Sequence, residues 1–104
     1  MGDDQSGSVT SHPEWDTFPI KVELLYPVKK GKGENEVEFT EFEIGRRLQA
    51  KDLTGIAASN MSFDDTMKLI SRLTGQPRSN IELLDGKDML KFTEIINYFL
   101  GIGQ

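Results

Sequence analysis

Apolar and polar residues alternate regularly in the first half of the chain. Every second residue from Ile20 to Val28 is large and apolar. Side chains alternate between the two faces of a β-strand, so this spacing predicts a strand with one buried face. Pro27 has no amide hydrogen for a ladder, which predicts a sheet edge at that point. The buried face must be covered by other parts of the chain, and this requirement constrains the fold more than any other feature.

A second strand is predicted over residues 36–44, after a turn rich in glycine and lysine over residues 29–35. Its apolar residues fall first on odd and then on even positions: Val37, Phe39, Phe42 and Ile44. The change of phase at Thr40 and Glu41 predicts a β-bulge or sharp bend there. Two strand halves that face different partners are the alternative. A short turn joins only antiparallel neighbours, so the two strands are expected to form a hairpin.

Helical spacing replaces alternation from Leu48 onward. A short helix is predicted over residues 50–59, although Gly55 weakens it. The residues expected to face inward in it are Leu53, Ile56 and Ala57. A second helix is predicted between Ser62, a typical N-cap, and Gly75, a typical C-terminal stop. The inward face of this helix is predicted to consist of Phe63, Met67, Ile70 and Leu73.

Two further helical segments are predicted near the end of the chain. Ser79 and a glutamate three residues later have the spacing of a capping box, which predicts a short helical turn over residues 79–84. Asp85 is the expected cap of a last helix over residues 86–100, with a glycine directly after it. The inward face of that helix is predicted to consist of Met89, Phe92, Ile95, Ile96, Phe99 and Leu100. Two apolar residues fall off this face and are expected to be partly exposed: Leu90 and Tyr98.

The predicted fold class is α+β: one small domain in which an N-terminal antiparallel β-hairpin is followed by three to four helices. This domain is assigned to residues 19–104, and residues 1–18 are expected to form a flexible acidic tail with little to bury. Trp15 and Phe18 are the exceptions in the tail. They either dock its end on the core or belong to a mobile segment.

Composition excludes several classes of function. The chain has no cysteine, which rules out thiolate metal sites and cysteine nucleophiles. Its only histidine, His12, lies in the predicted tail, where a catalytic role is not expected. A net charge of −5 disfavours nucleic acid or an anionic membrane as partner. The chain shows neither a membrane-spanning run nor an export signal, so we expect a soluble protein that is not exported.

The remaining charged clusters have structural interpretations. Asp64 with Asp65, and Asp85 with Asp88, could bind a metal, but helix capping explains them better. The lysines of residues 29–32 could bind phosphate, but no Walker spacing surrounds them and a solvated turn is favoured. We therefore predict no catalytic residue, no metal site and no cofactor.

Partner binding is the function that remains, and its candidate residues are Leu25, Arg46, Arg47, Leu90 and Tyr98. The apolar members are expected to be partly exposed, because each falls off the apolar face of its element. The arginine pair either anchors an acidic partner or neutralises Glu41 and Glu43. An unpaired hairpin edge could also take a partner strand or support self-association.

The order of motifs resembles a known family. The strand at Ile20–Val28 is followed by Arg46-Arg47-Leu48, by Leu-Ile-Ser-Arg-Leu-Thr-Gly at residues 69–75, and by Leu-Leu-Asp-Gly-Lys-Asp at residues 83–88. Across residues 19–101 the chain is similar to the tail assembly chaperones of Mu-like and related contractile-tailed phages and prophages.

This resemblance implies a non-structural helper in the cytoplasm of the bacterial host that is absent from the finished virion. Its expected partner is the tape measure protein, which such chaperones keep soluble during tail assembly. The tail-tube protein is a further candidate partner, and in some phages a longer form arises by frameshifting. A small non-enzymatic adaptor or inhibitor that binds another protein is the alternative function.

Overall fold

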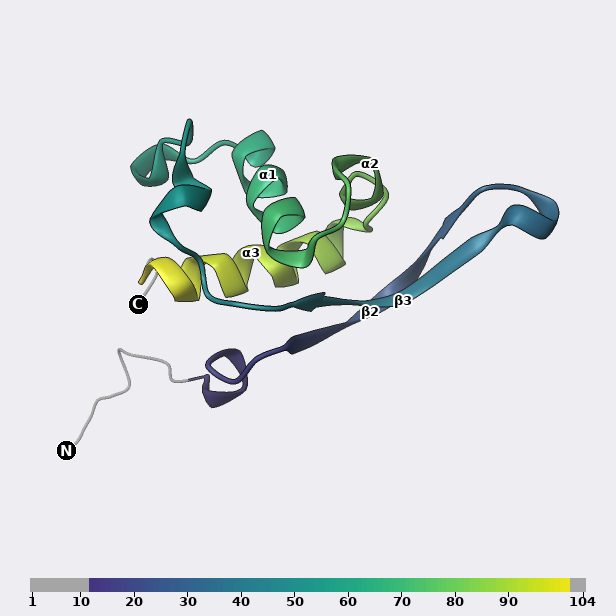
Figure 1. Cartoon of the computed structure of the whole chain (residues 1–104), viewed down its shortest axis with the longest axis horizontal. Helices are drawn as coiled ribbons and strands as arrows, with labels where there is room; N and C mark the ends of the chain where they lie inside the picture. The colour runs from purple at the N-terminus through teal and green to yellow at the C-terminus, as the bar shows by residue number, and fades with distance from the viewer. Residues whose placement is uncertain (1–11, 102–104) are drawn as a thin grey trace.

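The hairpin predicted from the alternating residues is present in the computed structural model, which describes residues 12–101 (Figure 1). Its strands are antiparallel, and three α-helices follow them. The bounds are β2 (Ile20–Lys30), β3 (Val37–Ile44), α1 (Phe63–Thr74), α2 (Arg78–Ile81) and α3 (Gly86–Leu100). This arrangement confirms the predicted α+β class.

One face of the hairpin forms the floor of the core. All three helices lie on the same side of the two strands in Figure 1, and the far end of the hairpin extends beyond them. The radius of gyration of 15.2 Å reflects this extension, because a compact domain of about 100 residues measures about 13 Å. The buried strand residues are Ile20, Val22, Leu24, Val28, Phe42 and Ile44. The helices bury Leu69, Ile70, Leu73, Ile81, Met89, Phe92, Ile95 and Ile96 against them.

The strand irregularity lies at the predicted level but on the other strand. Glu23 pairs with Glu41 and Val28 pairs with Phe39, so the four residues between Glu23 and Val28 lie opposite Thr40 alone. The additional residues therefore belong to β2, and the assignment of the bulge to the second strand was wrong. The change of phase in β3 lies opposite the bulge in β2, where the pairing of the two strands is interrupted.

Helix α1 begins as predicted, but its buried face differs. The Ser62 hydroxyl accepts a hydrogen bond from the Asp65 N–H at 3.0 Å, and the Asp65 carboxylate accepts one from the Ser62 N–H at 3.2 Å. Gly75 ends the helix in the left-handed conformation with φ 73°. Phe63, predicted to face inward, is 64% exposed. Ile70 and Leu73 are buried as predicted, and Met67 is partly buried against the core. Thr66 and Leu69 complete the buried face at i, i+3, i+4, i+7 spacing.

The helix predicted over residues 50–59 does not form. Two short 3-10 turns, Ala50–Leu53 and Ala58–Asn60, take its place. Gly55 lies between them with φ 79°, a left-handed conformation that an α-helix cannot contain. Ala57, predicted to face inward, is exposed.

The last two helices confirm the predicted segments, with one cap corrected. Asp85 caps α3 and accepts a hydrogen bond from the Lys87 N–H at 2.9 Å. Helix α2, however, begins at Arg78 after Pro77, and Ser79 does not cap it. Ser79 instead accepts a hydrogen bond from Lys30 across the domain. The capping box predicted at Ser79 was therefore wrong.

The described part of the predicted tail is docked on the core. Trp15 is 6% exposed, and its ring stacks on His12 with centroids 3.9 Å apart. Phe18 packs against Phe99 with ring centroids 6.0 Å apart. The docking alternative is thus confirmed for both aromatic residues. Residues 1–11 of the predicted tail lie outside the described range, and the domain boundary at residue 18 stays a prediction.

Candidate protein-binding surface

Arg46 is engaged within the domain. Its guanidinium donates to both carboxylate oxygens of Asp52, at 2.7 and 2.9 Å, and Asp52 also accepts a hydrogen bond from the Gln49 N–H at 2.7 Å. Asp52 is 3% exposed. The hydrogen bonds from Arg46 lower the pKa of Asp52 to about 2, and the same contact raises the pKa of Arg46. Arg46 closes the loop after β3, and its guanidinium is engaged by Asp52 instead of facing a partner protein.

Arg47 and Tyr98 meet on one carboxylate from the N-terminal segment. Asp16 accepts a hydrogen bond from Arg47 at 3.1 Å and another from the Tyr98 hydroxyl at 2.5 Å. The Asp16 carboxylate raises the pKa of Tyr98. Arg47 also lies 5.2 Å from the centre of the Phe99 ring, a cation–π contact. Among the described residues, neither arginine pairs with Glu41 or Glu43, so the predicted neutralisation was wrong.

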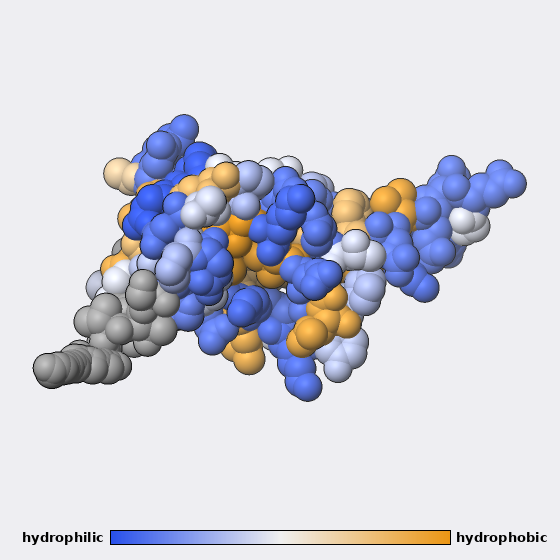
Figure 2. Space-filling model, turned by 90° about the horizontal axis from the view of Figure 1, so that it is seen from below, coloured by the Kyte–Doolittle hydropathy of each residue, from blue (hydrophilic) through white to orange (hydrophobic). Residues whose placement is uncertain are grey.

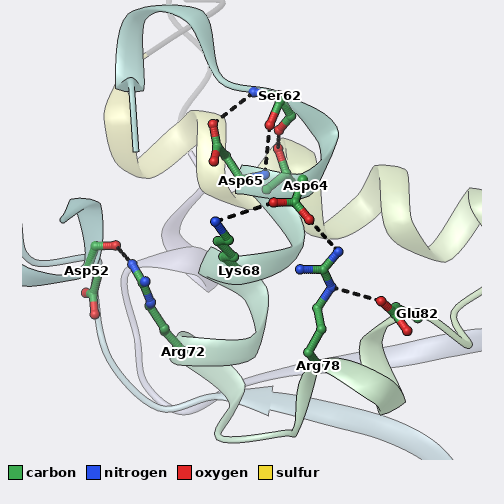
Figure 3. Close-up of polar contacts among 9 residues, drawn as sticks. Asp52, Ser62, Asp64, Asp65, Lys68, Arg72, Arg78 and Glu82 are labelled. Atoms are coloured by element: carbon green, nitrogen blue, oxygen red, sulfur yellow. Dashed lines mark hydrogen bonds and ion pairs between the residues drawn. The ribbon is translucent and has the colours of Figure 1, made fainter. Parts of the chain in front are cut away.

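The acidic pair at the start of α1 has internal partners, which Figure 3 shows together. Asp65 completes the capping box, whereas Asp64 pairs with Arg78 at 2.6 Å and with Lys68 at 3.4 Å. The hydrogen bond from Arg78 lowers the pKa of Asp64. Nearby, Arg72 donates to the backbone carbonyl of Asp52. Within residues 12–101, no group of three or more acidic or histidine side chains is placed to hold a metal ion.

Lys30 is the lysine of the hairpin turn that has a structural partner. Its ammonium group donates to the Ser79 hydroxyl at 3.0 Å and to the Asn80 side-chain oxygen at 2.7 Å. Asn80 is 5% exposed. Lys30 therefore fastens the end of β2 to α2 while its side chain stays exposed. Lys29 and Lys32 are exposed as well, as the interpretation of a solvated turn predicts.

Asp88 has a role that neither capping nor metal binding describes. Its carboxylate is 2% exposed and accepts hydrogen bonds from two successive backbone N–H groups, those of Leu25 at 2.8 Å and Tyr26 at 3.0 Å. These N–H groups lie in the irregular part of β2, where pairing with β3 is interrupted. Asp88 thereby satisfies donors that the bulge leaves unpaired. The phase slip and Pro27 signalled the irregularity, but no sequence feature connected it to Asp88.

Two apolar candidates lie beside this carboxylate and are largely exposed. Leu25 is 69% exposed and Leu90 is 64% exposed. Both line a groove of about 300 Å³ between the β2 bulge and α3. The other residues of its lining are Glu23, Lys87, Asp88, Lys91 and Glu94. Figure 2 shows one face of the molecule, on which hydrophobic atoms reach the surface in separate patches between hydrophilic side chains.

The structure therefore divides the five candidate residues into two groups. Arg46, Arg47 and Tyr98 hold the loop after β3 and the N-terminal segment in place. Leu25 and Leu90 lie together at the groove, where they do not contribute to the buried core.

Comparison with known protein families supplies the identity of the domain. Residues 21–101 match the family described as phage tail assembly chaperone proteins, E, or 41 or 14. The chain belongs to this phage tail assembly chaperone family. No curated protein and no solved structure matches it.

The region shared with the tail assembly chaperones contains the groove and nearly all of the hairpin–helix domain. It includes β3, the three α-helices and all of β2 except Ile20. Trp15 and Asp16 precede it, so the docked N-terminal segment is an addition to the matched region of this chaperone. None of the helices that the structure describes combines the length and apolar character needed to cross a bilayer.

Proposed function

We propose that this chaperone binds the tape measure protein of its phage and keeps that protein soluble until the tail tube is built around it. The observation that carries the proposal is the family match over residues 21–101, which includes the exposed leucines Leu25 and Leu90. The family resemblance implies that the tape measure protein exposes apolar side chains before it is enclosed. A helper for it needs an apolar contact surface on a well-hydrated protein, and the net charge of −5 favours solubility.

We further propose that the protein acts by binding and not by catalysis, in the cytoplasm of the host bacterium and outside the finished virion. The support is the structural use of the candidate groups. Asp52 and Asp88 satisfy backbone or arginine donors, Asp65 and Asp85 cap helices, and His12 stacks on an aromatic ring.

Co-expression with the tape measure protein from the same phage genome tests the proposal. We expect a larger soluble fraction of the tape measure protein and a complex that co-purifies with the tagged chaperone. The matched control is Phe92→Asp, which places a charge at a fully buried position and should abolish folding. Unchanged solubility together with no complex would contradict the proposal.

Mass spectrometry of purified particles tests the location. The chaperone should be detected in lysates of induced cells and be absent from tails purified to constant composition. A stoichiometric amount in the particles would mean that the protein is a structural component of the tail.

A further inference from the structure

The groove beside the β2 bulge has a defined construction. Leu24 is buried at 8% exposure, whereas the next residue, Leu25, is 69% exposed and forms part of one wall. Leu90 belongs to the facing helix α3 and lines the same groove. Asp88 of α3 also lines the groove and accepts hydrogen bonds from the backbone N–H groups of Leu25 and Tyr26. The volume of about 300 Å³ lies at the lower end of the ~300–1,000 Å³ typical of ligand pockets. It is suited to one or two large side chains of a partner.

A partner strand cannot pair with β2 beside this groove. The N–H groups of Leu25 and Tyr26 already donate to Asp88, and Pro27 has no N–H. Three successive residues therefore offer no backbone donor, and strand addition depends on a continuous series of such donors and acceptors. The predicted use of the hairpin edge is blocked on this part of β2, and side chains must make the contact here.

The α3 wall has the spacing that packs against another helix. Lys87, Leu90, Lys91 and Glu94 occupy positions i, i+3, i+4 and i+7 and line the groove together. Seven residues of α-helix span about 10 Å, so Lys87 and Glu94 stand about two turns apart. Such a ridge of side chains can pack between the side-chain ridges of a second helix.

Charge gives the groove two distinct ends. Lys87 and Lys91 lie in the first two turns of α3, whereas Glu94 lies about one turn beyond Lys91. The Lys91 ammonium also lies 5.4 Å from the centre of the Trp15 ring, a cation–π contact within the domain. Within residues 12–101, neither Lys87 nor Glu94 forms an ion pair, and Glu23 forms none either. Glu23 stands directly opposite Glu41 on the exposed face of the hairpin, and like charges in this arrangement repel each other. A cation near Glu23 and Glu94 and an anion near Lys87 would complement the site.

We propose that this groove receives one amphipathic helix of the tape measure protein, with a large apolar side chain between Leu25 and Leu90. The helix carries an acidic residue that faces Lys87 and a basic residue that faces Glu94, about seven positions apart. Asp88 acts as a positioning residue, because it holds the bulge that presents Leu25. The identity of the partner rests on the function proposed above, whereas the helical and charged character of the bound segment follows from the groove.

Paired substitutions test the placement. Leu25→Glu and Leu90→Glu alter the groove, and Phe63→Glu and Leu83→Glu alter apolar residues of similar exposure outside it, at 64% and 49%. After co-expression with the tape measure protein, each groove variant should reduce the recovered complex by about tenfold or more. Each control should change it by less than about twofold, and all four variants should keep the wild-type melting temperature.

Site-specific crosslinking tests the kind of occupant. The chain has no cysteine, so Leu90→Cys introduces a single attachment point for a photoreactive maleimide. In the co-expressed complex, crosslinks should fall on helical segments of the tape measure protein that carry acidic and basic residues about seven positions apart. Crosslinks mainly to a second copy of the chaperone would overturn the proposal and identify the groove as a self-interface.

The two proposals can fail separately. If the wild-type protein does not bind the tape measure protein, the proposed function fails. If the wild type binds while Leu25→Glu and Leu90→Glu bind equally well, the function stands and the groove proposal is wrong.

Discussion

Asp52 and Asp88 are both nearly inaccessible to solvent, but they are stabilised in different ways. Asp52 faces the guanidinium of Arg46 and the N–H of Gln49, so most of its stabilisation comes from a nearby opposite charge. Asp88 accepts hydrogen bonds from the N–H groups of Leu25 and Tyr26, which are neutral donors. The partners of the Asp52 carboxylate are three and six residues away in the sequence, whereas those of the Asp88 carboxylate are 62 and 63 residues away.

The Asp52 carboxylate thus makes local contacts, whereas the Asp88 carboxylate makes tertiary contacts. The contacts of the Asp52 carboxylate close the loop that follows β3 and can form as soon as that loop folds, whereas the Asp52 backbone carbonyl accepts a hydrogen bond from Arg72 of α1. The Asp88 contacts join α3 to β2 and require the whole domain. Asp88 is therefore expected to matter for the fold and the groove together, whereas Asp52 is expected to matter for one loop.

Asp88→Ala should destabilise the domain more than Arg46→Ala, Asp85→Ala or Asp64→Ala. It leaves two partly buried backbone N–H groups without partners, and we expect a loss of about 3 kcal/mol in the free energy of unfolding. Urea denaturation measures this loss. Amide hydrogen exchange at Leu25 and Tyr26 should accelerate more than exchange in α1, because the bulge is released first.

Asp85→Ala is the matched control, since it removes an aspartate three residues earlier that only caps the helix. Its expected cost is about 1 kcal/mol. Equal losses for Asp85→Ala and Asp88→Ala would show that the bulge does not depend on the Asp88 carboxylate. Asp88→Asn keeps one acceptor oxygen and should fall between the two.

Sequence reasoning succeeded for several features that depend on local contacts, although the capping box predicted at Ser79 is also local and does not form. The Ser62 and Asp85 caps, the stop at Gly75 and the alternation of the first strand up to Leu24 each depend on residues within one turn or one strand. Tyr26, which belongs to the predicted buried face, is 50% exposed because the bulge interrupts the alternation. Sequence reasoning failed for residues 50–59, where the left-handed conformation of Gly55 interrupts helical spacing.

The groove could be predicted only in part. The exposure of Leu25 and that of Leu90 are predicted separately from a strand and a helix, and nothing in the sequence predicts that the two side chains line one groove. Their proximity results from the packing of α3 on β2 and from the Asp88 contacts across more than sixty residues. The burial of Trp15 could not be predicted from the sequence for the same reason. One of its ring contacts, Tyr98, belongs to the last helix and is far from Trp15 in the sequence.

Arg46→Ala should have the second largest effect. It leaves the Asp52 carboxylate buried without its cation, and we expect a loss of about 2 kcal/mol in the free energy of unfolding. The Arg46 side chain is 37% exposed, so water can partly replace it and limit the loss. A double-mutant cycle with Asp52→Ala measures the coupling. Additive losses would show that the two side chains do not stabilise each other.

The Asp52–Arg46 contact should also make stability depend on pH in the acidic range. The pKa of Asp52 is lowered in the folded state from the ordinary 3.8 to about 2. The contribution is therefore fully present above pH 4 and is lost as the pH falls through 2. We expect about 1–2 kcal/mol at most, after allowance for solvent around Arg46. Other carboxylates titrate in the same range, so the measured quantity is the difference in unfolding free energy between wild type and Arg46→Ala at pH 5, 4, 3 and 2. A difference that stays constant over this series would contradict the assignment.

Asp64→Ala should have the smallest effect, although Asp64 has two cationic partners. Its side chain is 54% exposed, and Arg78 and Lys68 are also in contact with solvent. Water therefore stabilises all three charges in the unfolded and folded states alike, and exposed ion pairs add little to stability. The urea midpoint should move less than for Arg46→Ala, and added salt should reduce even that change. A shift as large as that for Asp88→Ala would mean that the number of charged partners determines the stabilisation. The smaller shift would mean that burial and unsatisfied backbone donors determine it, as the contrast between Asp52 and Asp88 indicates.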